Sequence, residues 1–76
     1  MDIDAYAAAH RDQWDRLDEL TRRRRLNGAE TDELVSLYRA TAGHLSRIRT
    51  GAPDPELIVE VSARVAAARG RITGAR

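Results

Sequence analysis

The residues of this sequence best suited to chemistry are its two histidines, His10 and His44. Neither has a carboxylate or a second histidine three or four residues away, the spacing that places two metal ligands on one helical face. The chain has no cysteine, so it offers neither thiolate ligands nor disulfides. The sequence therefore predicts no metal site. We expect His10 to pack near Tyr6 and Trp14, and His44 to lie at the edge of a helix.

Nucleophilic catalysis has no better support. Ser46 lies two residues from His44, so on a helix the two side chains point to different faces. No acidic residue is spaced to orient either one, and the sequence has no glycine-rich phosphate loop. A chain of 76 residues also has little room for a deep pocket. We therefore expect a protein that is not an enzyme and that uses no cofactor.

A run of four arginines, Arg22–Arg25, is the most prominent charged feature. Four consecutive helical residues spread around about one full turn, so they do not form a flat basic strip. No aromatic stacking platform accompanies them, and the net charge is only +1. Three uses stay open. The run can end a helix in which Asp18 and Glu19 pair back to it, it can attract an anionic membrane or acidic protein, or it can bind nucleic acid.

Two breaks divide the chain into three segments, each with apolar residues spaced by three and four. The breaks are Leu26–Gly28 and Thr50–Asp54. This pattern predicts an all-α fold, an antiparallel three-helix bundle with helices over about residues 4–25, 28–49 and 55–70. Leu57 is expected to flank the core. The expected core stripes are Ile3, Tyr6, Ala7, His10, Trp14, Leu17 and Leu20, then Leu34, Leu37, Tyr38, Thr41, Leu45 and Ile48, then Ile58, Val61, Val65, Ala68 and Ile72.

Capping signals mark the helix starts. Asp2 or Asp4 can cap the first helix, and Asn27 followed by Glu30 indicates a capping box. Asp54 before a proline at the first helical position indicates the third start.

Within the first helix, acid-before-base spacing predicts the ion pairs Asp12–Arg16, Asp18–Arg22 and Glu19–Arg23. Near the end of the chain, two glycines weaken the third helix, because each costs about 1 kcal/mol against alanine in a helix interior. We expect this helix to fray after about Arg69.

Several stretches resemble one known family in order along the chain. They are MDIDAYAAAHRDQWDRLDEL (1–20), NGAETDELVSLYR (27–39), His44-Leu45-Ser46 with Arg49, Pro53-Asp54-Pro55, and ARVAAAR (63–69). Together they resemble actinobacterial membrane proteins of the stage II sporulation protein M family. Members of that family continue into several transmembrane helices. The resemblance implies that these residues form a soluble cytoplasmic N-terminal domain of a larger integral membrane protein. The basic tail would then be juxtamembrane charge; its arginines are Arg64, Arg69, Arg71 and Arg76.

The resemblance and the lack of a catalytic constellation together predict a non-enzymatic interaction domain at the cytoplasmic face of the cell membrane. Its expected partners are other proteins of a membrane complex, or a second copy of itself. Membrane attachment would come from a transmembrane region beyond these residues. The alternative is a small soluble nucleic-acid-binding bundle that uses its arginine clusters. The candidate partner-binding residues are Arg22, Arg23, Arg24, Arg25, Arg47 and Arg49.

The resemblance also leads to an expected orientation. If the third helix leads into the membrane, we expect the Arg22–Arg25 run at the opposite pole of the bundle. It would then face the cytoplasm, where an acidic protein is its best partner.

Overall fold

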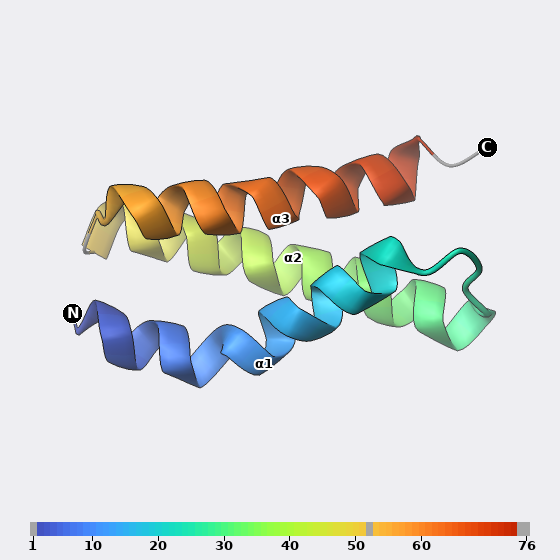
Figure 1. Cartoon of the computed structure of the whole chain (residues 1–76), viewed down its shortest axis with the longest axis horizontal. Helices are drawn as coiled ribbons and strands as arrows, with labels where there is room; N and C mark the ends of the chain where they lie inside the picture. Colours follow the sequence, from blue (N-terminus) through green and yellow to red (C-terminus); the bar gives the residue numbers. More distant parts are fainter. Residues whose placement is uncertain (1, 52, 75–76) are drawn as a thin grey trace.

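Three α-helices make up the structure, a computed structural model that describes residues 2–51 and 53–74. They are α1 (Ile3–Arg22), α2 (Gly28–Gly51) and α3 (Pro55–Thr73). The helices run alternately in opposite directions and pack on one another in a bundle that measures 38 × 20 × 15 Å (Figure 1). No described residue lies in a strand. The predicted all-α three-helix bundle is confirmed.

The core consists of two neighbouring clusters that take residues from all three helices. The predicted stripes supply seven of its eight buried apolar residues. Leu57, expected only to flank the core, is the eighth and is 8% exposed. It precedes Val61 by one turn and so shares its face. One cluster contains Trp14, Ile48, Leu57 and Val61, and the other contains Leu17, Leu20, Leu34 and Ala68.

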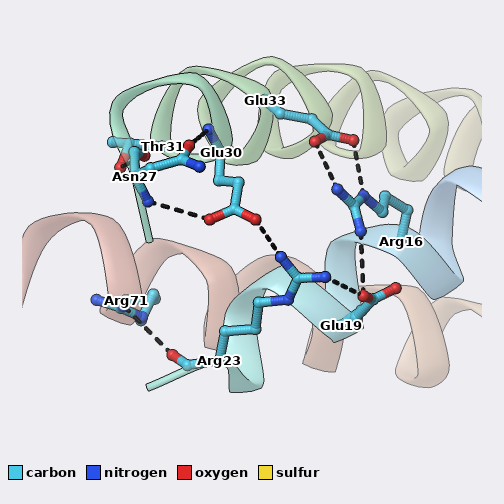
Figure 2. Close-up of polar contacts among 8 residues, drawn as sticks. All are labelled: Arg16, Glu19, Arg23, Asn27, Glu30, Thr31, Glu33 and Arg71. Carbon is cyan, nitrogen blue, oxygen red and sulfur yellow. Dashed lines mark hydrogen bonds and ion pairs between the residues drawn. The ribbon is translucent and has the colours of Figure 1, made fainter. Parts of the chain in front are cut away.

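The predicted caps are confirmed at all three helix starts. Asp2 accepts hydrogen bonds from the N–H groups of Asp4 and Ala5. The side chain of Asn27 accepts from the N–H of Glu30 at 2.7 Å, and the Glu30 carboxylate accepts from the N–H of Asn27 at 3.0 Å (Figure 2). This is the reciprocal geometry of a capping box. Asp54 accepts from the N–H of Leu57 at 3.2 Å.

We expect Asn27→Ala to lower the free energy of unfolding by about 1 kcal/mol, because one N–H at the start of α2 loses its acceptor. Asn27→Ser is the matched control, since serine can make the same bond. Chemical denaturation of the three proteins would measure the difference. Equal losses for alanine and serine would show that the cap is not the cause.

Two predicted helix ends are wrong. The first helix ends at Arg22 rather than residue 25, because Arg23 already has extended backbone angles, with φ −66° and ψ 140°. The third helix does not fray after Arg69 but continues to Thr73. Ile72 packs against a core cluster, and the guanidinium of Arg71 donates to the backbone carbonyl of Arg23 at 3.3 Å. These tertiary contacts outweigh the weak helix propensity of glycine.

The expected orientation of the arginine run is also wrong. In three antiparallel helices the first and third run in the same direction, so their ends share a pole. The contact between Arg71 and Arg23 demonstrates this directly. Figure 1 shows the ends of α1 and α3 together, far from the N-terminus and from the start of α3. The run therefore lies at the pole where α3 ends.

Candidate functional site

The four arginines of the run have different environments. Arg23 is partly buried, and its guanidinium bonds the carboxylates of Glu19 and Glu30 (Figure 2). Arg22 is exposed at the end of α1, and Arg24 and Arg25 are exposed in the connection to α2. Arg23 therefore holds the α1–α2 junction together, while the other three are available to solvent.

The ion pairs of α1 differ in part from the prediction. Glu19–Arg23 is confirmed. The pairs Asp12–Arg16 and Asp18–Arg22 do not form within residues 2–51. Arg16 and Asp18 instead make ion pairs with residues of other helices.

Arg16 explains one of these differences. It makes a two-pronged contact with Glu33 of α2, at 2.8 and 2.9 Å, and a further contact with Glu19 (Figure 2). Hydrogen bonding from Arg16 lowers the pKa of the Glu33 carboxyl. The two parallel hydrogen bonds from Arg16 to Glu33 are more favourable than a single ion pair of Arg16 with the nearby Asp12.

Asp18 explains the other difference. It accepts a hydrogen bond from Arg64 of α3 at 2.9 Å. Arg64 also bonds Glu60 at 2.6 Å and has a side chain only 15% exposed. Hydrogen bonds from Arg64 and Arg11 lower the pKa of Glu60.

The six candidate arginines do not form one surface. The run lies at the pole where α1 and α3 end, close to Arg71. Arg47 and Arg49 lie near the C-terminal end of α2, which is at the other pole. Arg76, the last arginine of the basic tail, lies outside the described residues.

Arg47 and Arg49 also face different hollows, although they are only two residues apart. Arg49 lies in a groove between α2 and α3, called here the α2–α3 groove, and Arg47 in a pocket between α1 and α2, called here the histidine pocket. The groove is lined by Tyr38, Leu45, Arg49, Ser62, Val65, Ala66, Arg69, Gly70 and Thr73. The pocket is lined by Tyr6, His10, Arg39, Ala40, Gly43, His44 and Arg47.

The two histidines lie against each other in the histidine pocket. Their ring centroids are 4.0 Å apart, with 32° between the ring planes. His10 also contacts Tyr6 and Trp14, as predicted. His44 is half-buried at the edge of α2 that faces α1, and its Nδ1 accepts a hydrogen bond from the indole Nε1 of Trp14 at 3.0 Å, which the sequence did not predict. Only the packing of α1 on α2 brings the pair together, so helical spacing could not reveal it.

The hydrogen bond from Trp14 fixes the tautomer of the neutral His44 ring. Because Nδ1 is an acceptor, the neutral ring carries its proton on Nε2. Burial lowers the pKa of His44 below its usual 6.5, and the nearby His10 and Arg47 lower it further. Within the described residues, no three histidine, aspartate or glutamate side chains gather closely enough to hold a metal ion.

We expect acidification from about pH 7.5 to about pH 5.5 to destabilise the protein. The pKa of His44 is lower in the folded chain than its unfolded value of 6.5. Below that value the unfolded chain binds more protons, so stability falls as the pH falls. Urea unfolding midpoints would measure the loss, which His44→Gln should reduce. The carboxyls with lowered pKa values do not interfere, because their losses begin only below about pH 5.5.

The α2–α3 groove borders an uncharged surface. Between Glu56 and Arg69, the only charged residues of α3 are Glu60 and Arg64. Both make ion pairs with α1, to Arg11 and to Asp18 respectively. Between these two ion-paired residues and the groove, the solvent-facing side of α3 instead exposes apolar residues. These are Val59, which is 69% exposed, with Ala63, Ala66 and Ala67.

Comparison with known families finds a family model that matches the chain. Residues 4–74 match the family model described as "Domain of unknown function (DUF8413)". The chain belongs to this family. No curated protein and no solved structure matches it.

The match extends through all three helices, so the DUF8413 domain coincides with the bundle. Among the residues that the structure describes, no helix is both long and apolar enough to cross a lipid bilayer. The features of this DUF8413 domain that stand out are therefore the α2–α3 groove, the histidine pocket and the exposed arginines of the run.

Proposed function

We propose that this DUF8413 domain is a non-enzymatic protein-interaction domain that docks an amphipathic helix of a partner protein in the α2–α3 groove. The observation that carries the proposal is the uncharged exposed surface beside this groove, with Val59 69% exposed. Apolar side chains that gather on one face of a soluble domain are characteristic of interaction sites. A helix laid between α2 and α3 would cover them, as helix-in-groove partners do.

The charge and the length of the α2–α3 groove indicate which kind of partner helix would fit it. Arg49 and Arg69 line the groove, and no carboxylate does. The partner helix should therefore carry acidic residues beside its apolar stripe. Tyr38 and Arg49, both of which line the groove, are eleven residues apart on α2, so it is about 16 Å long. About three helical turns of a partner fit this length.

We further propose that the domain works at the cytoplasmic face of a stage II sporulation protein M-like membrane protein. The ordered sequence resemblance supports this context. If α3 leads toward the bilayer, the exposed arginines Arg22, Arg24 and Arg25 share its pole and face anionic lipid, which attracts arginine. This favours the groove, rather than the arginine run, as the site for a protein partner. The separation of the arginines between two poles favours protein over nucleic acid.

Affinity capture of the full-length protein from its own cells tests the proposal. Three forms would be compared: wild type, Ala66→Glu, and the matched control Ala9→Glu on the exposed surface of α1. We expect a partner that the wild type and Ala9→Glu capture equally, and that Ala66→Glu loses about tenfold or more. The captured protein should contain an amphipathic helix with acidic flanks. Equal capture by all three forms would overturn the proposal.

Sedimentation of the same three proteins provides a second check. Self-association that Ala66→Glu abolishes and Ala9→Glu retains would identify a second copy as the occupant. That result would overturn the acidic helix of another protein. Arg49→Glu should weaken capture of an acidic helix, whereas Arg47→Glu, two residues away and outside the groove, should not.

A further inference from the structure

The histidine pocket is a second candidate binding site, separate from the α2–α3 groove. It lies between α1 and α2, and its volume is about 350 Å³. Two arginines line it, together with two histidines and a tyrosine, and no carboxylate does. Arg39 and Arg47 make no ion pair among the described residues. They are eight residues apart on α2, about 12 Å along the axis, so they flank the pocket from its two ends.

The polar atoms of this pocket have unmet hydrogen-bonding capacity. The Oη of Tyr6 and the Nδ1 of His10 are buried and have no hydrogen-bond partner. Buried polar atoms in native proteins nearly always have a partner, which can be a water or a bound ion. His44 has its Nδ1 occupied by Trp14, which leaves Nε2–H as a donor. Each lining group that carries a proton can therefore donate a hydrogen bond to an acceptor atom of a ligand in the pocket.

A metal cation does not fit the pocket. The two imidazole rings lie face against face, 4.0 Å between centroids, so their lone pairs do not converge on one point. The Nδ1 of His44 is already used by Trp14. Arg39 and Arg47 would also repel a cation.

We infer that the histidine pocket binds a phosphate group, held by Arg39 and Arg47 and by the imidazole of His44. Guanidinium groups match the oxygens of a phosphate with two parallel hydrogen bonds. The pocket, at about 350 Å³, is larger than one phosphate needs, because a water molecule in the liquid occupies only about 30 Å³. A phosphate monoester therefore fits as well as the free ion. Gly43 lines the pocket without a side chain, and a Cβ added there would meet no atom within 4 Å.

Titration of the protein with inorganic phosphate, glycerol 3-phosphate, acetate and chloride at constant ionic strength tests the inference. The observables are the imidazole resonances of both histidines and the indole N–H resonance of Trp14. At about pH 7.5 the His44 ring is neutral, because burial lowers its pKa below the usual 6.5. We expect saturable shifts with both phosphates and none with chloride. Tighter binding of glycerol 3-phosphate would identify a monoester as the ligand, and tighter binding of inorganic phosphate would identify the free ion.

Variants separate a built site from general attraction to arginine. Arg47→Gln should weaken phosphate binding about tenfold or more, because a charged hydrogen-bonding partner is lost. Arg49→Gln is the matched control, since it removes another exposed arginine from the same end of α2 outside the pocket. Gly43→Asp should abolish binding by adding a carboxylate where the Cβ meets nothing. Circular dichroism would verify the fold of each variant.

Three results would overturn the inference. They are shifts that do not saturate, equal shifts with chloride, and equal losses in Arg47→Gln and Arg49→Gln. None of these outcomes bears on the groove, because Ala66 and Arg49, whose variants test the groove, do not line the pocket.

Discussion

Trp14→Ala is expected to lower the free energy of unfolding by about 3–5 kcal/mol. Trp14 is fully buried and packs against Ile48, Leu57 and Val61, so its removal leaves a cavity at the meeting point of the three helices. A domain of 76 residues has a stability of roughly 4–11 kcal/mol, at about 0.05–0.15 kcal/mol per residue. The substitution should therefore remove at least about a quarter of the stability of the domain. Denaturation followed by far-ultraviolet circular dichroism measures this without relying on tryptophan fluorescence.

Trp14→Phe separates packing from hydrogen bonding. Phenylalanine keeps an aromatic ring in the core but cannot donate to His44, which the Trp14 indole does at 3.0 Å. We expect it to lose less than half of what alanine loses, because burial contributes more than one hydrogen bond of about 1 kcal/mol. If phenylalanine were as costly as alanine, the Trp14–His44 bond rather than core packing would dominate.

Arg64→Met should have the second-largest effect, a loss of about 1–3 kcal/mol. Methionine retains the apolar stem of Arg64 but removes a guanidinium that is 15% exposed and bonds Asp18 and Glu60. Asp18, whose side chain is 28% exposed, would be left without this partner. The loss should be visible in urea unfolding at neutral pH.

Arg11→Met is the matched control for Arg64. Arg11 bonds the same carboxylate of Glu60, but its side chain is 44% exposed. Solvent screens such a pair, so its loss should be below about 1 kcal/mol and should shrink further in high salt. Similar losses for both variants would contradict the view that burial of Arg64 makes its pairs effective.

Much of the fold was predictable because its signals are local. The Asn27–Glu30 capping box and the Asp54 cap lie within four residues of the backbone groups that they satisfy, so their spacing is sufficient. The apolar period of three and four predicted the core face of each helix, including Trp14. The helix ends were less predictable, because Arg71 and Ile72 hold α3 in place through contacts with distant parts of the chain.

The candidate site was less predictable than the fold. The run Arg22–Arg25 could be recognised, but its division into one structural arginine and three exposed ones depends on Glu30 of the next helix. The pole of the bundle at which the run lies follows from topology alone, since the first and third of three antiparallel helices end at the same pole. Arg49 was a candidate by its charge, and the structure adds that it lines a groove beside an uncharged surface.

The sequence by itself therefore determined three amphipathic helices, their caps and all but one of the buried apolar residues of the core. The tertiary structure alone decided which side chains meet across helices. It stacked His10 on His44, gave Arg16 to Glu33 and Asp18 to Arg64, and separated Arg47 from Arg49 into two hollows. The physical reason is that helical periodicity fixes neighbours three and four residues apart. Contacts between helices depend instead on how each helix is rotated about its axis and shifted along it when the core packs.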